Sequence, residues 1–272
     1  MITFRDMTVA DIPAGLSLCR SAGWNQLEND WNVFLSLSKY GNRVAVNDDG
    51  KIVGTVTTIT YEDRFSWIGM VLVDPAMKRQ GIGTQLLRES LELLANQETI
   101  KLDATPAGRE VYLKLGFEDE YVLSRMMSTQ KVSLKNSSPG KKGSFFSIAD
   151  TDKKVFGASR KDLLQLYHEA FPEFCFIKNS SNYCFGRRGY NFTQIGPVVA
   201  DSAEQAIELT TAALNNIEGA VVLDVMENSA FSGWLNSIGF VEQRKLIRMY
   251  RGKNNFPGIP AKQFAILGPE FG

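Results

Sequence analysis

The sequence predicts an α/β (α+β) protein made of two tandem units, each a mixed, mostly antiparallel sheet flanked by helices. Three observations support this fold class. Strand and helix patterns alternate along the first half, a polar segment interrupts the chain near its middle, and four short motifs recur in order beyond it. We expect one unit over residues 1–128, a linker over 129–143 and a second unit over 144–272.

Local patterns define the elements of the first unit. Short apolar runs indicate strands, and apolar residues three or four positions apart indicate helices. In order, we expect a strand over 2–5, a helix opening at Thr8, a helix over 29–38, strands over 43–46, 52–60 and 65–73, a helix over 82–95, a strand over 100–104, a helix over 107–115 and a strand over 117–126. The turn signals DDG and YEDR separate the three middle strands, which predicts an antiparallel meander.

The segment 129–143, TQKVSLKNSSPGKKG, has the Ser, Pro, Gly and Lys content of a linker. Beyond it the motifs of the first unit recur. Four motifs match: Ile68-Gly69-Met70-Val71 and Asp74 with Ile195-Gly196-Pro197-Val198 and Asp201, Leu102-Asp103 with Leu223-Asp224, Leu115-Gly116-Phe117 with Ile238-Gly239-Phe240, and Arg125-Met126 with Arg248-Met249. The second unit is shorter between its aspartates and lacks a glycine-containing loop, so we expect it to have lost a function.

The composition excludes several classes of protein. The 30 basic and 30 acidic residues give no net charge, so nucleic acid is not an expected partner. The chain shows neither a signal peptide nor a run of about 20 apolar residues, so we expect no membrane contact and a cytoplasmic location. The three cysteines lack CxxC spacing, and the single histidine, His168, has helical apolar neighbours. We therefore expect buried thiols, no metal and no histidine-based catalysis.

A glycine-containing loop, Lys78-Arg79-Gln80-Gly81-Ile82-Gly83-Thr84, lies between an apolar strand and an amphipathic helix. Glycines let consecutive backbone N–H groups point at one anion, and the start of a helix adds partial positive charge. The pattern favours a phosphate or pyrophosphate, with a plain tight turn as the alternative. A dinucleotide GxGxxG motif fails because Leu86 stands at the third glycine.

This loop resembles the pyrophosphate loop of the GNAT N-acetyltransferase superfamily, Arg/Gln-x-x-Gly-x-Gly/Ala. The match is Lys78-x-x-Gly81-x-Gly83, and Lys78 departs from the usual Arg or Gln. The resemblance extends to WIGMVLVDP before the loop and ATPAGREVYLKLGF after it, and covers most of residues 2–127. The tandem arrangement resembles bacterial two-domain members whose C-terminal copy is degenerate.

The resemblance implies that strands four and five of the first unit splay apart to admit acetyl-CoA, the cosubstrate. It implies that the pantetheine arm and pyrophosphate are held by Val71, Leu72, Val73, Lys78, Arg79, Gln80, Gly81, Ile82, Gly83 and Thr84. The implied function is transfer of the acetyl group to the amine of a small molecule, by direct attack on the thioester, in a monomer or homodimer. The alternative is a CoA-binding regulatory or scaffold protein in which neither unit catalyses.

The resemblance also places Tyr112 where a phenol of the superfamily protonates the departing thiolate. The alternative is that Tyr112 only packs its helix on the sheet. No base is assigned for the amine. Glu62 and Asp63 are candidates, although YEDR equally fits a solvated hairpin turn, and Asp103 could either reach the cleft or make a structural hydrogen bond.

An aromatic and acidic cluster lies between the first two helices, where proteins of this superfamily often build the acceptor pocket. Its members are Trp24, Asn25, Glu28, Asp30 and Trp31. Carboxylates beside indoles would suit a cationic amine, whereas the alternative has core tryptophans and a solvated acidic loop. Arg187, with Arg188, could face the cleft from the second unit and bind a carboxylate, or could form an exposed turn.

Overall fold

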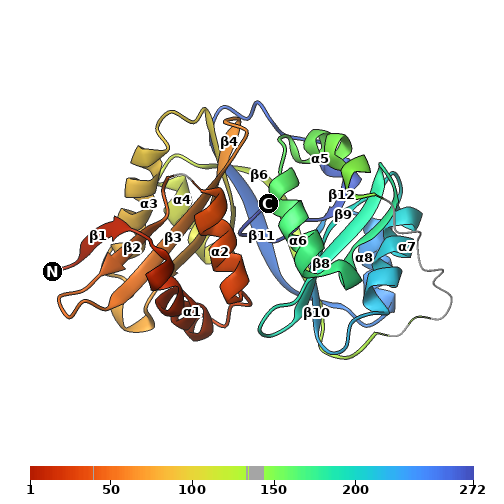
Figure 1. Ribbon diagram of the computed structural model, residues 1–272, viewed down its shortest axis with the longest axis horizontal. Helices are drawn as coiled ribbons and strands as arrows, with labels where there is room; N and C mark the ends of the chain where they lie inside the picture. The colour runs from red at the N-terminus through yellow and green to blue at the C-terminus, as the bar shows by residue number, and fades with distance from the viewer. Residues whose placement is uncertain (39, 133, 135–143) are drawn as a thin grey trace.

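The computed structural model describes residues 1–38, 40–132, 134 and 144–272 and consists of two halves joined through one sheet (Figure 1). The elements of the first half are β1 (Thr3–Asp6), η1 (Val9–Asp11), α1 (Ile12–Ser21), α2 (Glu28–Leu37), β2 (Arg43–Val46), β3 (Ile52–Tyr61), β4 (Phe65–Val73), η2 (Pro75–Met77), α3 (Ile82–Leu93), β5 (Thr99–Ala104), α4 (Pro106–Leu113) and β6 (Glu118–Ser128).

The second half repeats this alternation and also begins with two helices, as the first half has α1 and α2, but the described residues include no counterpart of β1 before them. Its elements are η3 (Phe145–Ser147), α5 (Ala149–Phe156), α6 (Lys161–Ala170), η4 (Pro172–Phe174), β7 (Phe176–Asn179), β8 (Asn182–Arg187), β9 (Thr193–Val199), α7 (Ala203–Leu214), β10 (Val221–Met226), α8 (Ser229–Ser237), β11 (Val241–Gly252), η5 (Pro260–Lys262) and β12 (Gln263–Ala265).

The elements expected in the first half are confirmed to within two residues at nearly every end, and β2, β3 and β4 form the expected antiparallel meander. The helix expected from Thr8 differs, because it begins as the 3₁₀ turn η1 and becomes α-helical only at Ile12. Pro13 then stands in the first turn of α1, where its fixed φ is tolerated and no N–H is needed.

The order of the strands shows that the two halves exchange strands. In the described residues, twelve strands form one sheet in the order β1-β2-β3-β4-β5-β11-β6-β10-β12-β9-β8-β7. Strand β11 of the second half lies between β5 and β6, and β6 of the first half lies between β11 and β10. Each half therefore contributes a strand to the other. Of the expected linker, residues 133 and 135–143 lie outside the described residues.

The repeated motifs occupy equivalent positions in the two halves. Strands β4 and β5 pair in parallel at Ser66 with Ile100, and β9 and β10 pair in parallel at Thr193 with Val221. These four residues are equivalent when the repeated motifs are superimposed in sequence. The internal repeat read from the sequence therefore corresponds to a repeat of structure.

The exchanged strands carry two matching ion pairs. Arg248 of β11 donates two hydrogen bonds of 2.9 Å to the carboxylate of Asp103 on β5. Arg125 of β6 donates two hydrogen bonds of 2.7 Å to the carboxylate of Asp224 on β10. The aspartate of each repeat is thus paired with the arginine of the other repeat. The recurring Asp and Arg motifs are explained by this exchange.

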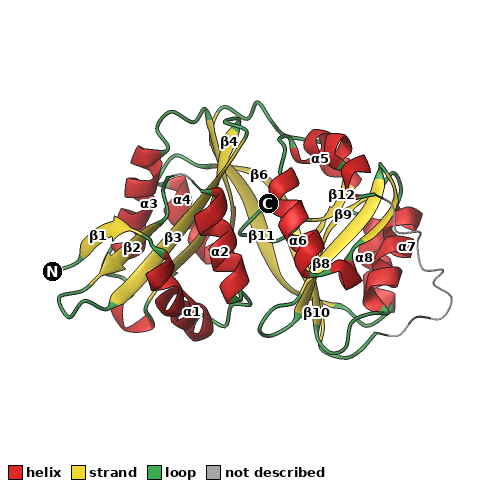
Figure 2. Ribbon diagram, viewed as in Figure 1, coloured by secondary structure: helices red, strands yellow, loops and turns green. Residues whose placement is uncertain are grey.

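The helices form two layers on the sheet (Figure 2). Helices α1, α2, α5 and α6 share one apolar cluster that crosses both halves. Helices α3 and α4 cover a second cluster in the first half, and α7 and α8 cover a third in the second half. His168 lies in α6 as expected, against Phe145 and Phe185, and all three cysteines are buried. No helix in the described part of the chain is long and apolar enough to cross a membrane.

Candidate functional site

A cavity of about 520 Å³ opens where β4 and β5 separate, which we call the first cleft. The two strands pair only at Ser66 with Ile100 and at Trp67 with Lys101. Beyond these pairs β4 bulges at Met70, whose φ of 49° is left-handed, and the register with β3 shifts. The splayed strands expected in the first half are therefore present.

The glycine-containing loop forms one wall of the first cleft. Arg79 and Gly81 adopt φ values of 63° and 79°, and Gly81 is the N-cap of α3. No side chain caps α3, and among the described residues Lys78 and Arg79 make no ion pair. Free N–H groups beside two uncommitted cations form a site suited to a phosphate.

Most residues expected to hold the cofactor line the cavity; these are Val71, Val73, Lys78, Arg79, Gly81, Ile82, Gly83 and Thr84. Two do not. Leu72 is buried in the apolar cluster shared by α1 and α2, and Gln80 is exposed to solvent. Their side chains therefore do not contact the cavity.

Tyr112 lines the cavity from α4, whose first turn is capped by the Thr105 hydroxyl. The Tyr112 ring packs edge-on against Phe117, and the described residues provide no hydrogen-bond partner for its hydroxyl. Burial raises the pKa of Tyr112 to about 12. At neutral pH this side chain is therefore a neutral hydrogen-bond donor. Its structural counterpart in the second half is Leu235, which carries no donor.

The structure divides the expected acceptor residues. Trp24 and Asn25 line the cavity, but the Asn25 side chain is occupied with the loop between β8 and β9. Its Oδ1 accepts hydrogen bonds from the backbone N–H groups of Asn191 and Phe192 at 2.8 and 3.1 Å. A Cβ at Gly189 would lie 1.9 Å from the side-chain amide of Asn25, so these hydrogen bonds require glycine at position 189.

The other three members of that cluster lie away from the cavity. Glu28 is exposed at the start of α2, and Trp31 is fully buried beneath Gly15 of α1. Asp30 is buried and accepts a hydrogen bond of 2.6 Å from the Tyr167 hydroxyl. Packing between α2 and α6 occupies these side chains, so the structure corrects their assignment to the acceptor pocket.

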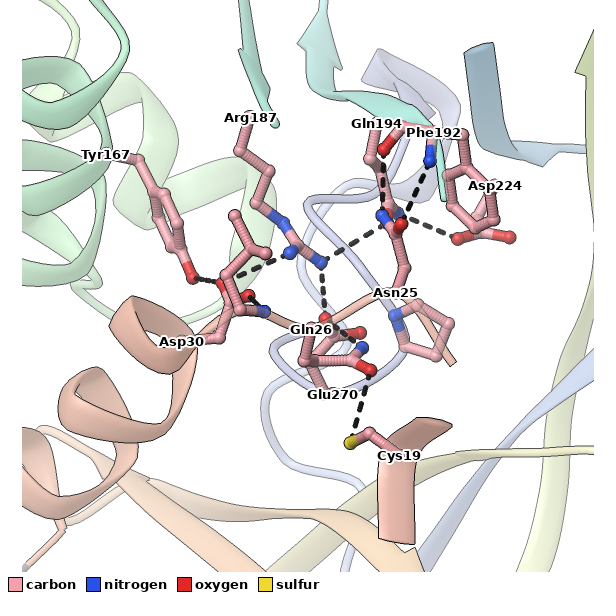
Figure 3. Close-up of polar contacts among 12 residues, drawn as sticks. Cys19, Asn25, Gln26, Asp30, Tyr167, Arg187, Phe192, Gln194, Asp224 and Glu270 are labelled. Atoms are coloured by element: carbon pink, nitrogen blue, oxygen red, sulfur yellow. Dashed lines mark hydrogen bonds and ion pairs between the residues drawn. The ribbon is translucent and has the colours of Figure 1, made fainter. Parts of the chain in front are cut away.

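The structure also corrects the assignment of Arg187 to the acceptor site, because this side chain lies inside a buried polar network (Figure 3). Its guanidinium donates to Asp30 at 3.1 Å and to Gln194 at 3.2 Å, and forms an ion pair with Glu270. These partners leave Arg187 committed within the protein. Arg188, next along the chain, is exposed and pairs with Glu173.

None of the three expected bases is free to act in the cavity. Glu62 and Asp63 form the hairpin turn after β3, with φ of 51° and 55°, and Glu62 pairs with Lys153. They do not line the cavity. Asp103 does line it, but both of its oxygens accept hydrogen bonds from Arg248. Asp103 therefore has the structural role that was its alternative interpretation.

Sequence reasoning missed Glu270, which enters the cavity on residues 267–272. Two side chains of β3 and β4 bind that segment: the Trp67 indole donates to the carbonyl of Pro269 at 2.9 Å, and the Tyr61 hydroxyl donates to that of Phe271 at 2.8 Å. A Cβ at Gly69 would lie 2.9 Å from the Glu270 carbonyl oxygen. No local pattern in the sequence GPEFG predicts that Glu270 lies in the cavity.

The carboxylate of Glu270 is only partly committed. Its Oε1 accepts a hydrogen bond of 2.8 Å from Gln26 and pairs with Arg187 (Figure 3). Within the described residues its Oε2 accepts no hydrogen bond. Of the carboxylates that line the cavity, Asp103 and Glu270, only Glu270 keeps a free oxygen among the described contacts. Glu270 can therefore accept a proton or bind a cation in the cavity.

The equivalent gap between β9 and β10, which we call the second cleft, is filled by protein. Strand β12 pairs with β9 at Gln263 and with β10 at Ala265. A Cβ at Gly196 would lie 1.8 Å from the Ile266 carbonyl, so backbone closely approaches backbone here. The short connection from β9 to α7 contains no glycine. The second cleft thus has neither the space nor the loop of the first.

Comparison with protein families matches both halves of the chain. Residues 16–117 match the acetyltransferase (GNAT) family, and residues 148–265 match an acetyltransferase (GNAT) domain. The two matches lie on either side of the expected linker. The chain is therefore similar to this family in each of its halves.

Individual proteins are similar along most of the chain. A holothin acyltransferase from Pseudoalteromonas sp. is 24% identical over 85% of this chain and 81% of that protein. The uncharacterized N-acetyltransferase YitH of Bacillus subtilis is 23% identical over 83% of each. A solved structure of a Pyrococcus horikoshii protein assigned to the acetyltransferases has a TM-score of 0.84 at 24% identity, over all of this chain and 96% of that one. The structural likeness shows a shared fold.

Proposed function

The chain is an acyltransferase that belongs to the GNAT acetyltransferase family, and we propose that it moves the acetyl group of acetyl-CoA to the amine of a small molecule. One observation carries the proposal. The first cleft is open beside a loop with uncapped N–H groups, whereas the equivalent second cleft is filled by β12. A ligand with a pyrophosphate and a long slender arm fits the first arrangement.

In this proposal residues 1–128 hold acetyl-CoA. The backbone of residues 71–73 pairs with the pantetheine amides beyond the last β4–β5 pair, and residues 78–84 surround the pyrophosphate. When bound, acetyl-CoA supplies an activated thioester. Residues 144–272 complete the acceptor side of the cavity through Phe192, Arg244 and Glu270.

The proposed reaction is a direct transfer. The amine nitrogen of the acceptor attacks the thioester carbonyl carbon, a C–N bond forms and the C–S bond breaks. The amine loses a proton to Oε2 of Glu270, directly or through water, and the thiolate leaves with the electron pair. Tyr112 donates a hydrogen bond to that thiolate. Because its pKa is about 12 and that of a thiol about 8.5, full proton transfer from Tyr112 would be uphill.

The proposal is tested with purified protein, acetyl-CoA and a panel of primary amines, by following release of the CoA thiol. We expect turnover in the wild type and a decrease in kcat of about 10- to 100-fold in Tyr112→Phe, since a hydrogen bond to a charged group contributes about 1.5–3 kcal/mol. Because the pKa of Tyr112 is about 12, this decrease should be constant from pH 6 to 9.

Tyr250→Phe is the matched control, because its hydroxyl binds Glu118 at the surface, away from the cavity. Its kcat should equal that of the wild type. Equal turnover in Tyr112→Phe and the wild type would leave Tyr112 a packing role only. Binding of acetyl-CoA without transfer to any amine would favour the alternative function, a CoA-binding regulatory or scaffold protein.

A further inference from the structure

Arg244 is a charged side chain of the cavity that the proposed reaction does not use. It lies on β11 beside a bulge, where the register with β6 shifts between Glu242 and Arg244. Its side chain is half-buried, and its Nε is buried without a hydrogen-bond partner. Burial and the nearby Arg125 lower the pKa of Arg244, and the weaker attraction of Asp224 and Glu270 does not offset them.

The fully buried arginines of the described residues are all paired. Their pairs are Arg125 with Asp224, Arg160 with Asp152, Arg187 with Asp30 and Glu270, and Arg248 with Asp103. Arg244 has no such partner within the part of the chain that the structure describes. A partly buried guanidinium without an anion is costly, so this position fits an anion that arrives with a ligand.

The position of β11 separates this anion from the pyrophosphate of the cofactor. The glycine-containing loop follows β4, whereas β11 is separated from β4 by β5. The charged groups that act on Arg244 are Arg125, Asp224 and Glu270, which come from β6, β10 and the segment 267–272. Arg244 therefore belongs to the acceptor side of the cavity.

The charges around Arg244 define the kind of anion. Arg125 and Asp224 neutralise each other, and Arg187 offsets only one of its two carboxylate partners, Asp30 and Glu270. Apart from Lys78 and Arg79, which lie in the loop 78–84, the cavity thus retains one positive charge at Arg244 and one negative charge near Glu270. A ligand with one carboxylate and one amine balances both, whereas a doubly charged phosphate would leave negative charge uncompensated.

We propose that Arg244 binds a carboxylate of the acceptor, so that the substrates are small molecules that carry both an amine and a carboxylate. This inference rests on the proposed function. The planar guanidinium can bind both carboxylate oxygens and thereby orient the molecule, while the free Oε2 of Glu270 faces the amine. Arg244 replaces Arg187 as the carboxylate-binding residue.

The test compares free acids with neutral analogues. The common amino acids, β-alanine and 4-aminobutyrate, each paired with its methyl ester, are assayed for kcat/KM with the wild type, Arg244→Gln and Arg251→Gln. Arg251 is an exposed arginine on the same strand and serves as the control. Comparing the acid-to-ester ratio between variants cancels the different amine pKa values of acids and esters.

We expect Arg244→Gln to lower kcat/KM for the best free acid by about 10- to 100-fold and to change the ester value less than threefold. Arg251→Gln should change neither. The affinity for acetyl-CoA, measured by thermal shift, should be unaltered. An equal decrease for acid and ester, or a weakened affinity for acetyl-CoA, would overturn the assignment of Arg244.

A binding measurement separates this inference from the proposed function. The same compounds are titrated into protein saturated with CoA, and protection against thermal unfolding is recorded. Protection by a free acid but not its ester, lost in Arg244→Gln, would support the anion site even if no acetyl group were transferred, and only the proposed function would then fail. No preference for free acids in the wild type, in either measurement, would overturn the inference.

Discussion

The first and second clefts begin alike and end differently. In both, two parallel strands share the same two-residue register and then separate. The first cleft stays open beside the loop 78–84, whereas the second is filled by β12, which pairs with both of its walls. Where two parallel strands diverge, their unpaired backbone N–H and C=O groups can thus either bind a ligand or form hydrogen bonds with another strand of the same chain.

The segment that fills the second cleft also leads into the first. Residues 266–272 follow β12 directly, run along β4 and bring Glu270 into the cavity. Phe271 anchors this segment by stacking on Phe34 at 4.8 Å. The second half therefore lacks an open cleft but supplies part of the site in the first half.

The largest expected effect on ligand binding distinguishes the clefts by their loops. Gly81→Asp puts a carboxylate and a Cβ into the anion site, so we expect acetyl-CoA affinity to fall by more than about 100-fold, measured by thermal shift or calorimetry. Gly219→Asp is the control, because both glycines have positive φ and open space around Cβ. Unchanged affinity in folded Gly81→Asp would remove the loop from the cofactor site.

The next effect tests whether the ion pairs of the two exchanged strands, β11 and β6, stabilise the protein equally. Arg248→Met and Arg125→Met each leave a buried aspartate without the cation that neutralises it, so we expect each to lower the free energy of unfolding by about 3–5 kcal/mol. Urea denaturation measures both. Adding Asp103→Leu to Arg248→Met should recover most of the loss, since an apolar pair replaces an ion pair well. A loss under about 1 kcal/mol would show that the ion pair does not stabilise the exchange.

The smallest effect concerns a matched pair at the surface. The repeated aspartates Asp74 and Asp201 each bind a lysine, Lys51 and Lys262, at 2.8 Å. Because both pairs are solvent-exposed, Lys51→Met and Lys262→Met should each cost less than about 1 kcal/mol, and less still at high salt. Thermal unfolding at low and high ionic strength would measure this. A markedly larger loss for one lysine would break the equivalence of the two halves.

Local chemistry in the sequence determined the elements, the repeat and the loop. Periodicity and turn residues act over a few positions, so β2 and β4 were predicted with their observed bounds. The loop 78–84 was found because glycines between a strand and a helix have a direct geometric meaning. The recurring Asp and Arg motifs were visible as a pattern, although their pairing across the two halves was not.

Only the tertiary structure decided which half each strand joins and which side chains face the cavity. Arg187 and Asp30 are 157 positions apart, and Gln26 and Glu270 are 244 apart, so no local pattern connects them. Their pairing depends on the packing of α2 against α6 and on the path of residues 267–272. Buried charges must find partners when the halves come together, and that requirement placed Arg187 in the interior and left Arg244 facing the cavity.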